Sequence, residues 1–223
     1  MDKTEYQAEK YAIRKRLLKY TRQAFAMLPP LENPRVLDIG CGPGIPTLEL
    51  ARLCDGEITG IDIDKEALKE LGSKANDAGL SGRVKVMRCS IEEMKFPDSS
   101  FDIVWAEGSI FVVGFERALK EWKRLLKPGG FMVVHDEEGE LEEKLKLIPA
   151  CGYELLGYIV LDKDTWWQEY YLPIRELTEK TLSTYGDIEE VRQMVESGQR
   201  EIEWFDENPG HNSSVIFVMR LND

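Results

Sequence analysis

Residues 36–46 read VLDIGCGPGIP, and this stretch decides the expected fold. The strand pattern RVLDI leads into glycines at positions 40, 42 and 44, and the helical pattern PTLELARL follows. Glycines suit this turn because it needs backbone angles that side chains resist, and because a missing Cβ lets a ligand approach the main chain. The helix that follows offers free amide N–H groups and a positive dipole end, which suit an anionic group such as a carboxylate.

The same alternation of strand and helix continues beyond the turn as far as Asp136. The strand patterns are EITGID, VKVMR, FDIVWAE and GGFMVVHD, and the helical patterns between them include KEALKELGSKANDAG and ERALKEWKRLL. This alternation predicts parallel βαβ units, since parallel neighbours need a crossover connection. Right-handed crossovers place helices on both faces of an open, doubly wound α/β sheet, and ligands bind beyond the carboxyl ends of its strands.

Helical segments flank this alternating region. Residues 1–33 carry a helical stripe of Ile13, Leu17, Ala24 and Leu28 and are expected to form an N-terminal helical cap. After a further strand pattern, YELLGYIVL, residues 164–208 are predicted to be a helical insertion before the closing strand SSVIFVMRL. We therefore predict a single domain over residues 1–223, with a ligand-binding core at residues 34–136 and an insertion placed to cover the ligand crevice.

The spacing of the glycines is GxGxG. The fingerprint of dinucleotide-binding folds is GxGxxG, and Ile45 stands where its third glycine is needed. A tight, purely structural turn remains an alternative reading of these glycines. Asp62, in EITGIDID, ends the second strand beside the turn, where a carboxylate accepts hydrogen bonds from both hydroxyls of a ribose. Its alternative role is to cap the helix that begins at Lys65, although Asp64 is better placed for that.

Two further motifs make the pattern specific. They read MRCSIEEMKFPDSSFDIVWAEGSI at residues 87–110 and LKEWKRLLKPGGFMVVHD at residues 119–136. In this order and spacing VLDIGCGPG, GIDID, FPDSSFDIV and RLLKPGG resemble the class I S-adenosylmethionine (SAM)-dependent methyltransferases, in particular the type 11, ubiquinone-methyltransferase-like group. The resemblance covers residues 34–136 and implies a Rossmann-like, seven-stranded sheet whose last strand is antiparallel.

The resemblance also implies which residues bind SAM. The glycine-rich turn would contact the methionine portion through Asp38, Gly40, Cys41, Gly42 and Gly44. Asp62 would bind the ribose and Ile63 would pack on the adenine. Ser90 stands where the family commonly has an Asp near the adenine amino group, which leaves the Ile91 N–H for an adenine nitrogen. Glu107 falls where the family's chain passes the methionine end of SAM.

Methyl transfer is an in-line displacement that releases a neutral thioether. Positioning and the exclusion of water can therefore supply much of the rate, and a base is needed only when the acceptor must lose a proton. His135 and Glu107 are candidates for that base, since each ends a strand beside the crevice. Asp136, and Tyr170 and Tyr171 of the insertion, are further candidates. His135 can equally be an edge-of-core histidine, so the catalytic residue stays unassigned.

Four aromatic residues of the insertion, Trp166, Trp167, Tyr170 and Tyr171, are candidates for the wall of the acceptor pocket. Their spacing equally suits packing of the insertion, because residues 166/170 and 167/171 are neighbours on a helix. The N-terminal segment has a basic face that is expected to be solvated, with binding of an anionic acceptor or a membrane surface as the alternative. Tyr6 and Tyr11 on this segment are further candidates to cover SAM.

Composition limits the possible partners. The chain has 29 Lys and Arg against 41 Asp and Glu, a formal charge of −12, which disfavours nucleic acid. We find no apolar run of signal-peptide or membrane-spanning type and predict a cytoplasmic protein. Its four cysteines lack a CxxC pair and two histidines accompany them, so we predict neither a metal site nor disulfides.

The predicted function is transfer of a methyl group from SAM to a small-molecule acceptor, with the oligomeric state and the methylated atom left open. One alternative is a nicotinamide-dependent oxidoreductase, which Ile45 and the RLLKPGG segment argue against. The other is a non-catalytic SAM-binding protein that acts as a regulatory or partner subunit. The motifs predict that SAM binds but say nothing about turnover.

Overall fold

The computed structural model describes residues 3–185 and 188–222. These residues divide into two compact units. The core unit comprises Tyr20–Asp136, Glu140–Ile159 and the described chain from Val215 onwards. The helical unit comprises the described residues up to Lys19, together with Glu137–Gly139 and Val160–Ser214.

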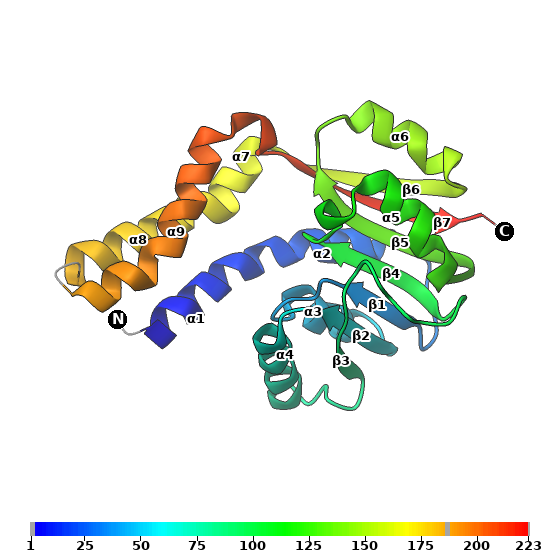
Figure 1. Ribbon diagram of the computed structural model, residues 1–223, viewed down its shortest axis with the longest axis horizontal. Coiled ribbons are helices and arrows are strands. Elements are labelled where there is room, and N and C mark those ends of the chain that lie inside the picture. The colour runs from blue at the N-terminus through cyan, green and yellow to red at the C-terminus, as the bar shows by residue number, and fades with distance from the viewer. Residues whose placement is uncertain (1–2, 186–187, 223) are drawn as a thin grey trace. The chain divides into compact units, whose positions relative to one another are not determined.

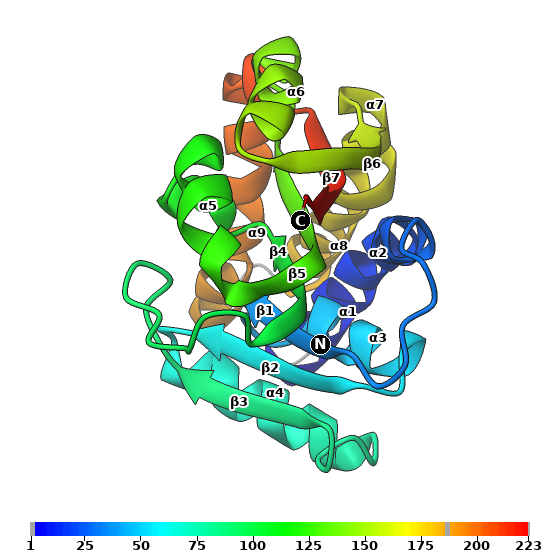
Figure 2. The ribbon, with the colours of Figure 1, turned by 90° about the vertical axis from the view of Figure 1, so that its right-hand side faces the viewer.

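The core unit is built on a seven-stranded sheet. Its strands are β1 (Arg35–Ile39), β2 (Glu57–Asp62), β3 (Val84–Arg88), β4 (Phe101–Glu107), β5 (Leu126–Glu137), β6 (Tyr153–Leu161) and β7 (Ser214–Leu221) (Figure 1). They lie in the order β3-β2-β1-β4-β5-β7-β6, with β3 and β6 at opposite edges (Figure 2). The last strand in sequence runs antiparallel to the other six. This confirms the predicted α/β architecture, including the antiparallel last strand.

Both faces of the sheet are covered by helices. These are α2 (Leu18–Ala26), α3 (Ile45–Leu53), α4 (Lys65–Asp77), α5 (Phe115–Trp122) and α6 (Leu141–Ala150). The central strands are consequently apolar on both sides, and in β4 the side chains of residues 103–106 are all fully buried. The strand order reverses between β1 and β4, so the carboxyl ends of these two strands flank the switch point where ligands bind in open α/β sheets.

Strand β5 begins earlier than its sequence predicts. The prediction ended a helix at Pro128 and started the strand at Gly130, whereas β5 starts at Leu126 and contains an irregularity. The register with β4 passes from Phe101 opposite Leu126 to Ile103 opposite Phe131. The Pro-Gly-Gly segment therefore forms a bulge inside the strand, since proline cannot donate to the ladder and Gly129 has a φ of 67°.

The N-terminal segment is helical but not uniform. Helix α1 (Lys3–Arg14) is joined to α2 by a 3₁₀ turn at Lys15–Leu17, and the boundary between the two units follows Lys19. Ile13, Ala24 and Leu28 of the predicted stripe are buried. The structure thus assigns α1 to a different unit from most of α2.

The helical unit contains the predicted insertion between the last two strands. Its elements are α1, α7 (Lys163–Trp166), a π-helical turn at Trp167–Tyr171, α8 (Leu172–Tyr185), α9 (Glu189–Glu207) and a 3₁₀ turn at Pro209–His211. Its apolar interior is formed by Tyr6, Ile13, Tyr170, Ile174, Leu177 and Val195. Helix α1 therefore shares one hydrophobic core with helices that follow it by more than 150 residues.

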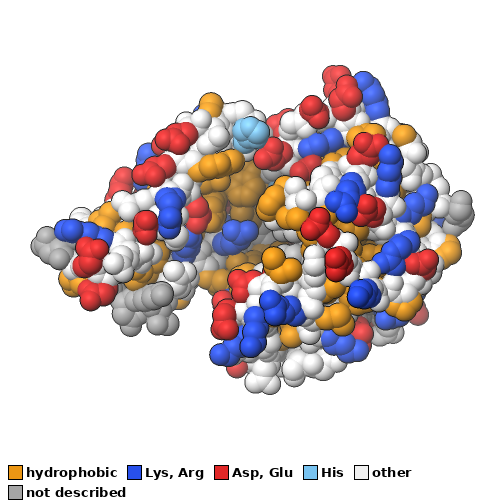
Figure 3. Space-filling view, in the orientation of Figure 1, with side chains coloured by type: hydrophobic (Ala, Val, Ile, Leu, Met, Phe, Trp, Pro, Cys, Tyr) orange, Lys and Arg blue, Asp and Glu red, His pale blue; other side chains and the backbone are white. Residues whose placement is uncertain are grey.

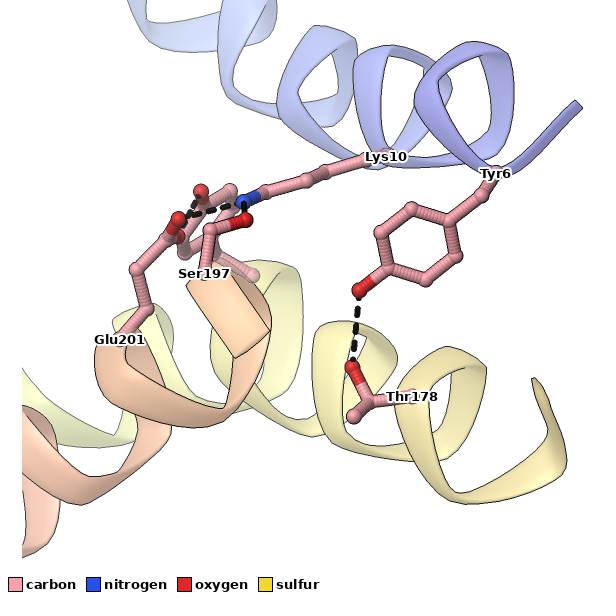
Figure 4. Close-up of polar contacts among 6 residues, drawn as sticks. Tyr6, Lys10, Thr178, Ser197 and Glu201 are labelled. Carbon is pink, nitrogen blue, oxygen red and sulfur yellow. Dashed lines mark hydrogen bonds and ion pairs between the residues drawn. The ribbon is translucent and has the colours of Figure 1, made fainter. Parts of the chain in front are cut away.

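Polar contacts also join α1 to α8 and α9 (Figure 4). The Tyr6 hydroxyl lies 3.1 Å from Thr178 Oγ1, and Lys10 Nζ donates to Ser197 Oγ at 3.2 Å and to Glu201 Oε1 at 2.5 Å. Tyr6 is fully buried here, inside the helical unit. Its predicted role as a cover for SAM gains no support from these contacts.

The basic face of the N-terminal segment is largely paired within the chain. Besides Lys10, Lys19 bonds Glu169 at 2.5 Å, and Arg22 bonds Glu49 at 2.6 Å. The Lys10 side chain is only 16% exposed, so the expectation of a solvated face is wrong for it, whereas Lys19 and Arg22 are 43% and 54% exposed and remain solvated as well as paired. Carboxylates of other helices supply their partners.

Candidate functional site

The predicted site residues gather at the carboxyl ends of the parallel strands. Asp62 ends β2, the glycine turn follows β1, and Glu107 ends β4. His135 lies opposite Glu107 in the register between β4 and β5. Because the neighbouring strands lie in the order β2-β1-β4-β5, these groups follow one another along the carboxyl-terminal end of the sheet.

Two of the three glycines in the turn are needed for packing. Gly40 and Gly44 have φ values of 71° and 85°, and a Cβ on either would lie within 2.3 Å of a side-chain carbon, of Ser109 and Leu71 respectively. Gly42 has a φ of 50° and no atom within 4 Å of where its Cβ would be. The turn is therefore closed at its two ends and open at Gly42, so a ligand can approach the backbone there.

The carboxylate of Asp62 organises this turn. Its Oδ2 accepts the Gly42 N–H at 2.9 Å and its Oδ1 accepts the Asp64 N–H at 2.9 Å. Asp64, not Asp62, caps α4, since Asp64 Oδ1 accepts the N–H groups of Glu66 and Ala67. Asp62 is half-buried, and each of its oxygens keeps acceptor capacity for a hydroxyl group.

Asp38 lies beneath the turn and is buried. Thr47 Oγ1 donates to its Oδ2 at 2.6 Å. Burial raises the pKa of Asp38 to about 7; the Thr47 hydrogen bond opposes this shift, and the charges of Glu107 and Asp62 add to it. A cation bound beside these three carboxylates would favour the ionised form of Asp38.

Glu107 is held by two neutral donors. Its Oε1 accepts the Trp105 indole N–H at 2.7 Å, and its Oε2 accepts the Thr21 hydroxyl at 3.2 Å. Neither donor was singled out in the sequence, although both left a signal. Thr21 is a polar residue inside the apolar stripe of the N-terminal segment, and Trp105 is a buried N–H donor two residues before Glu107 on the same strand.

The remaining residues predicted to contact SAM differ in exposure. The Cys41 side chain is buried, and burial raises the pKa of its thiol, so it is a packing group rather than a thiolate. Ile63 is 65% exposed directly after β2, which leaves an apolar surface for a planar ligand. Ser90 and Ile91 are half-buried after β3, and the Ser90 hydroxyl accepts the Glu92 N–H at 3.2 Å.

The candidate bases have different surroundings. His135 is half-buried beside Glu107 on the adjacent strand. Asp136 forms an ion pair with Lys144 at 2.7 Å. Burial raises the pKa of both Tyr170 and Tyr171, which keeps these phenols protonated and disfavours them as bases.

The four insertion aromatics pack within the helical unit. Trp167 stacks on Phe205 with ring centroids 5.5 Å apart, and the Tyr171 ring lies 4.1 Å from that of Phe205. Trp166 donates its indole N–H to Ser214 Oγ at 2.8 Å, and the Tyr170 hydroxyl donates to Glu201 Oε2 at 2.5 Å. Packing of the insertion thus accounts for much of this cluster, while Trp166, Trp167 and Tyr171 remain half-buried.

Within residues 3–185 and 188–222, we find no helix with the length and hydrophobicity to cross a membrane. The same residues contain no group of three or more His, Cys, Asp or Glu side chains able to hold a metal ion. On the face drawn in Figure 3, acidic and basic side chains are interspersed.

Comparison with known proteins identifies the core. A protein-family model described as a methyltransferase domain matches residues 37–134, which include most of β1, all of β2 to β4, most of β5 and the whole glycine turn. Residues 37–134 form a methyltransferase domain. This confirms the resemblance predicted from the four motifs.

Relatives of the methyltransferase domain support this assignment. The chain is 36% identical over 153 residues to a sterol 24-C-methyltransferase of Gibberella zeae, covering 56% of this chain and 40% of the relative. It is 30% identical over 165 residues to a 27-O-demethylrifamycin SV methyltransferase of Amycolatopsis mediterranei, covering 71% of this chain and 58% of the relative. The chain thus spans about half the length of these curated relatives.

The fold of the methyltransferase domain is also found in solved structures. A SAM-dependent methyltransferase from Geobacter sulfurreducens, solved with S-adenosyl-L-homocysteine (SAH), has a TM-score of 0.71 to this chain at 18% sequence identity. The similarity covers 92% of this chain and 91% of that one. It includes the helical segment between the last strands, which agrees with the predicted fold class.

The residues at the strand ends fit SAM chemically. The N–H groups at the start of α3 suit a carboxylate, and the missing Cβ of Gly42 lets a ligand approach the turn. Asp62, which accepts the Gly42 N–H, suits a pair of ribose hydroxyls. Asp38 and Glu107 are acidic groups near the same turn, and a carboxylate suits an ammonium or sulfonium group. The residues present are therefore chemically compatible with the amino-acid and ribose parts of SAM.

Proposed function

We propose that this chain is a SAM-dependent methyltransferase that acts on a small-molecule acceptor. The observation that carries the proposal is the open backbone at Gly42, bonded to Asp62 inside a methyltransferase domain. Gly42 needs glycine for its φ of 50°, but no atom lies within 4 Å of where its Cβ would be, so the backbone there stays accessible to a ligand.

Each polar group of the site then has a task. The N–H groups of the first turn of α3 bind the carboxylate of SAM beside the open backbone at Gly42, Asp62 binds its ribose, and Asp38 and Glu107 face its positive charge. SAM itself supplies a methyl group activated by the sulfonium. The chain contributes orientation and exclusion of water, which suffice when the acceptor has no proton to lose.

Where the acceptor must lose a proton, His135 is the proposed base, because Glu107 is assigned to the positive charge of SAM. His135 lies opposite Glu107 in the register of β4 and β5, beside the glycine turn. The acceptor itself is proposed to be a small organic molecule, as the names of the two relatives indicate for those proteins. Three of the insertion aromatics, Trp166, Trp167 and Tyr171, are half-buried and keep some exposed surface for such an acceptor. We also propose that residues 164–208 cover the substrate. A cytoplasmic location is a further proposal.

Calorimetric titration with SAM, SAH and NAD tests the cofactor assignment. We expect micromolar binding of SAM and SAH and no binding of NAD. Binding of NAD alone would refute the proposal. Turnover is then measured as SAH formation with a panel of small acceptors, and a protein that binds SAM but never forms SAH would be the non-catalytic alternative.

Replacement of the ribose ligand tests the site itself. Asp62→Ala is expected to weaken SAM binding by about 1 to 3 kcal/mol, because groups that were bonded to a carboxylate are left unpaired. Asp64→Ala is the matched control, since it removes a neighbouring carboxylate that caps α4. That control should cost roughly 1 kcal/mol of unfolding free energy and leave SAM affinity unchanged. Equal affinity losses in the two variants would contradict the ribose assignment.

A further inference from the structure

A hydroxyl from the N-terminal segment reaches the carboxyl end of β4. Thr21 is 1% exposed and lies on α2 among apolar neighbours. Its Oγ1 donates to Glu107 Oε2 at 3.2 Å, although 86 residues separate the two in sequence. Burying a hydroxyl on an apolar helix face costs free energy unless the hydroxyl is hydrogen-bonded. The Thr21 hydroxyl bonds a carboxylate at the carboxyl end of β4, where the ligand is proposed to bind.

Trp105 and Thr21 donate to different oxygens of Glu107 and so fix the orientation of its carboxylate. Trp105 holds Oε1 from the same strand, and its indole is fully buried in the core. Thr21 holds Oε2 from a different element, so the carboxylate plane is set by contacts on both oxygens. A hydroxyl and an indole N–H are neutral, so these contacts orient Glu107 without cancelling its charge.

The charge of Glu107 affects the ionisation of Asp38 beneath the glycine turn. Asp38, at the end of β1, lies opposite Trp105 in the register of β1 and β4. Glu107 is among the charges that raise the pKa of Asp38. The carboxylate that Thr21 orients is thus electrostatically part of the group around the glycine turn.

We propose that Thr21 is a positioning residue that aims the Glu107 carboxylate at the ammonium group of bound SAM or SAH. This inference rests on the proposed function of the site. It predicts that Thr21 affects recognition of the amino-acid part of the ligand and not of the nucleoside part, which Asp62 and the residues after β2 and β3 would bind.

The test compares two ligands that differ in this part. SAH carries the ammonium and carboxylate groups, whereas 5′-methylthioadenosine keeps the nucleoside and thioether and lacks both. Thr21→Val removes the hydroxyl at nearly constant shape. We expect it to weaken SAH about tenfold in calorimetric titration, the size of effect expected for one hydrogen bond to a charged group, and to change 5′-methylthioadenosine less than twofold.

Two further variants separate positioning from structure. Thr21→Ser keeps the hydroxyl and is expected to restore most of the SAH affinity. Glu107→Gln keeps the shape of the side chain, removes its charge, and should show the same selective loss. In the Glu107→Gln background, Thr21→Val should then have little further effect on SAH, because the charge that Thr21 orients is gone.

The outcomes are distinct. Equal weakening of both ligands by Thr21→Val, or no weakening of either, overturns the positioning role while the proposed function stands. Failure of the wild-type protein to bind either ligand overturns the proposed function and the inference together. Thr181→Val is a control for removal of a buried threonine hydroxyl, since Thr181 lies in the helical unit and donates to a backbone carbonyl; it should leave both affinities unchanged.

Discussion

At the scale of single residues, we expect Asp38 to make ligand binding depend on pH. Its pKa is about 7, against an ordinary value of 3.8, chiefly because the carboxyl is buried. The carboxyl is therefore partly protonated near neutral pH. A ligand that brings a cation to the site favours the ionised form, so binding must displace that proton.

We expect the affinity for SAH to rise as pH increases from 6 to 8, and the rise to disappear in Asp38→Asn. Thr47→Val should move the rise to higher pH, because the Thr47 hydroxyl stabilises the ionised carboxylate. Titration calorimetry across this range is the measurement. A pH profile unchanged by Asp38→Asn would show that another group controls it.

The same residue affects stability with the opposite slope. A raised folded-state pKa means that the stability present below about pH 4 is lost progressively as pH rises towards 7, where folded Asp38 ionises. Asp38→Asn should remove this loss. Urea unfolding at pH 5 and pH 8 would detect it as a smaller difference between the two conditions in the variant than in the wild type.

Alanine substitutions at two glycines of the turn should differ in their effects on SAH affinity and on stability. Gly42→Ala introduces a Cβ into open space, so its cost is the positive φ alone, about 1 to 2 kcal/mol. Gly44→Ala carries a similar backbone strain and also places a Cβ 2.2 Å from Leu71 Cδ1. It should therefore destabilise the protein more than Gly42→Ala does. The loss of SAH affinity per kcal/mol of lost stability should nevertheless be larger for Gly42→Ala than for Gly44→Ala. Calorimetry measures the affinities and urea unfolding measures the stabilities. If Gly42→Ala bound SAH as tightly as wild type, the ligand would not approach the turn there.

At the scale of elements, a helical glycine allows α1 to pack against α9. A Cβ on Gly198 would lie 2.6 Å from the Tyr6 hydroxyl and 2.8 Å from Thr178 Oγ1. Gly72 lies in the middle of α4 with nothing within 4 Å of where its Cβ would be. The packing of α9 therefore requires a glycine at position 198, whereas the surroundings of α4 leave room for a side chain at position 72.

Alanine at these two positions should change stability in opposite directions. Gly198→Ala is expected to destabilise the protein by about 1 to 3 kcal/mol, because Tyr6 and Thr178 must move. Gly72→Ala should stabilise it by up to about 1 kcal/mol, since alanine is the better helix former. Chemical denaturation of both variants provides the comparison, and stabilisation by Gly198→Ala would mean that α1 is not held against α9 as described.

At the scale of the whole molecule, ligand binding should stabilise the fold by mass action. SAH at about 100 times its Kd is expected to add about 2.7 kcal/mol to the free energy of unfolding. NAD at the same concentration should add nothing. Thermal unfolding followed with increasing SAH tests this, and equal stabilisation by NAD would argue for a dinucleotide site instead.

The sheet and the glycine turn were predictable because their signals are local. The alternation of strands and helices specifies a parallel sheet, and a strand–glycine–helix turn specifies where its ligand edge lies. Asp64 was identifiable as the cap of α4, and Asp62 as a candidate ligand residue, because both inferences depend on position within one short segment. The bulge in β5 was missed because proline and glycine signal both the end of a helix and an irregular strand.

What the sequence determined by itself is therefore the chain-local part of this protein: the order of strands and helices, the turn at residues 40–44, and the family of its core. Tertiary structure alone decided which distant groups meet. Thr21 reaches Glu107 across 86 residues, and Tyr6 reaches Thr178 across 172. The physical reason is that strand and helix patterns arise from neighbours along the chain, whereas a hydrogen bond between separate elements depends on how those elements pack.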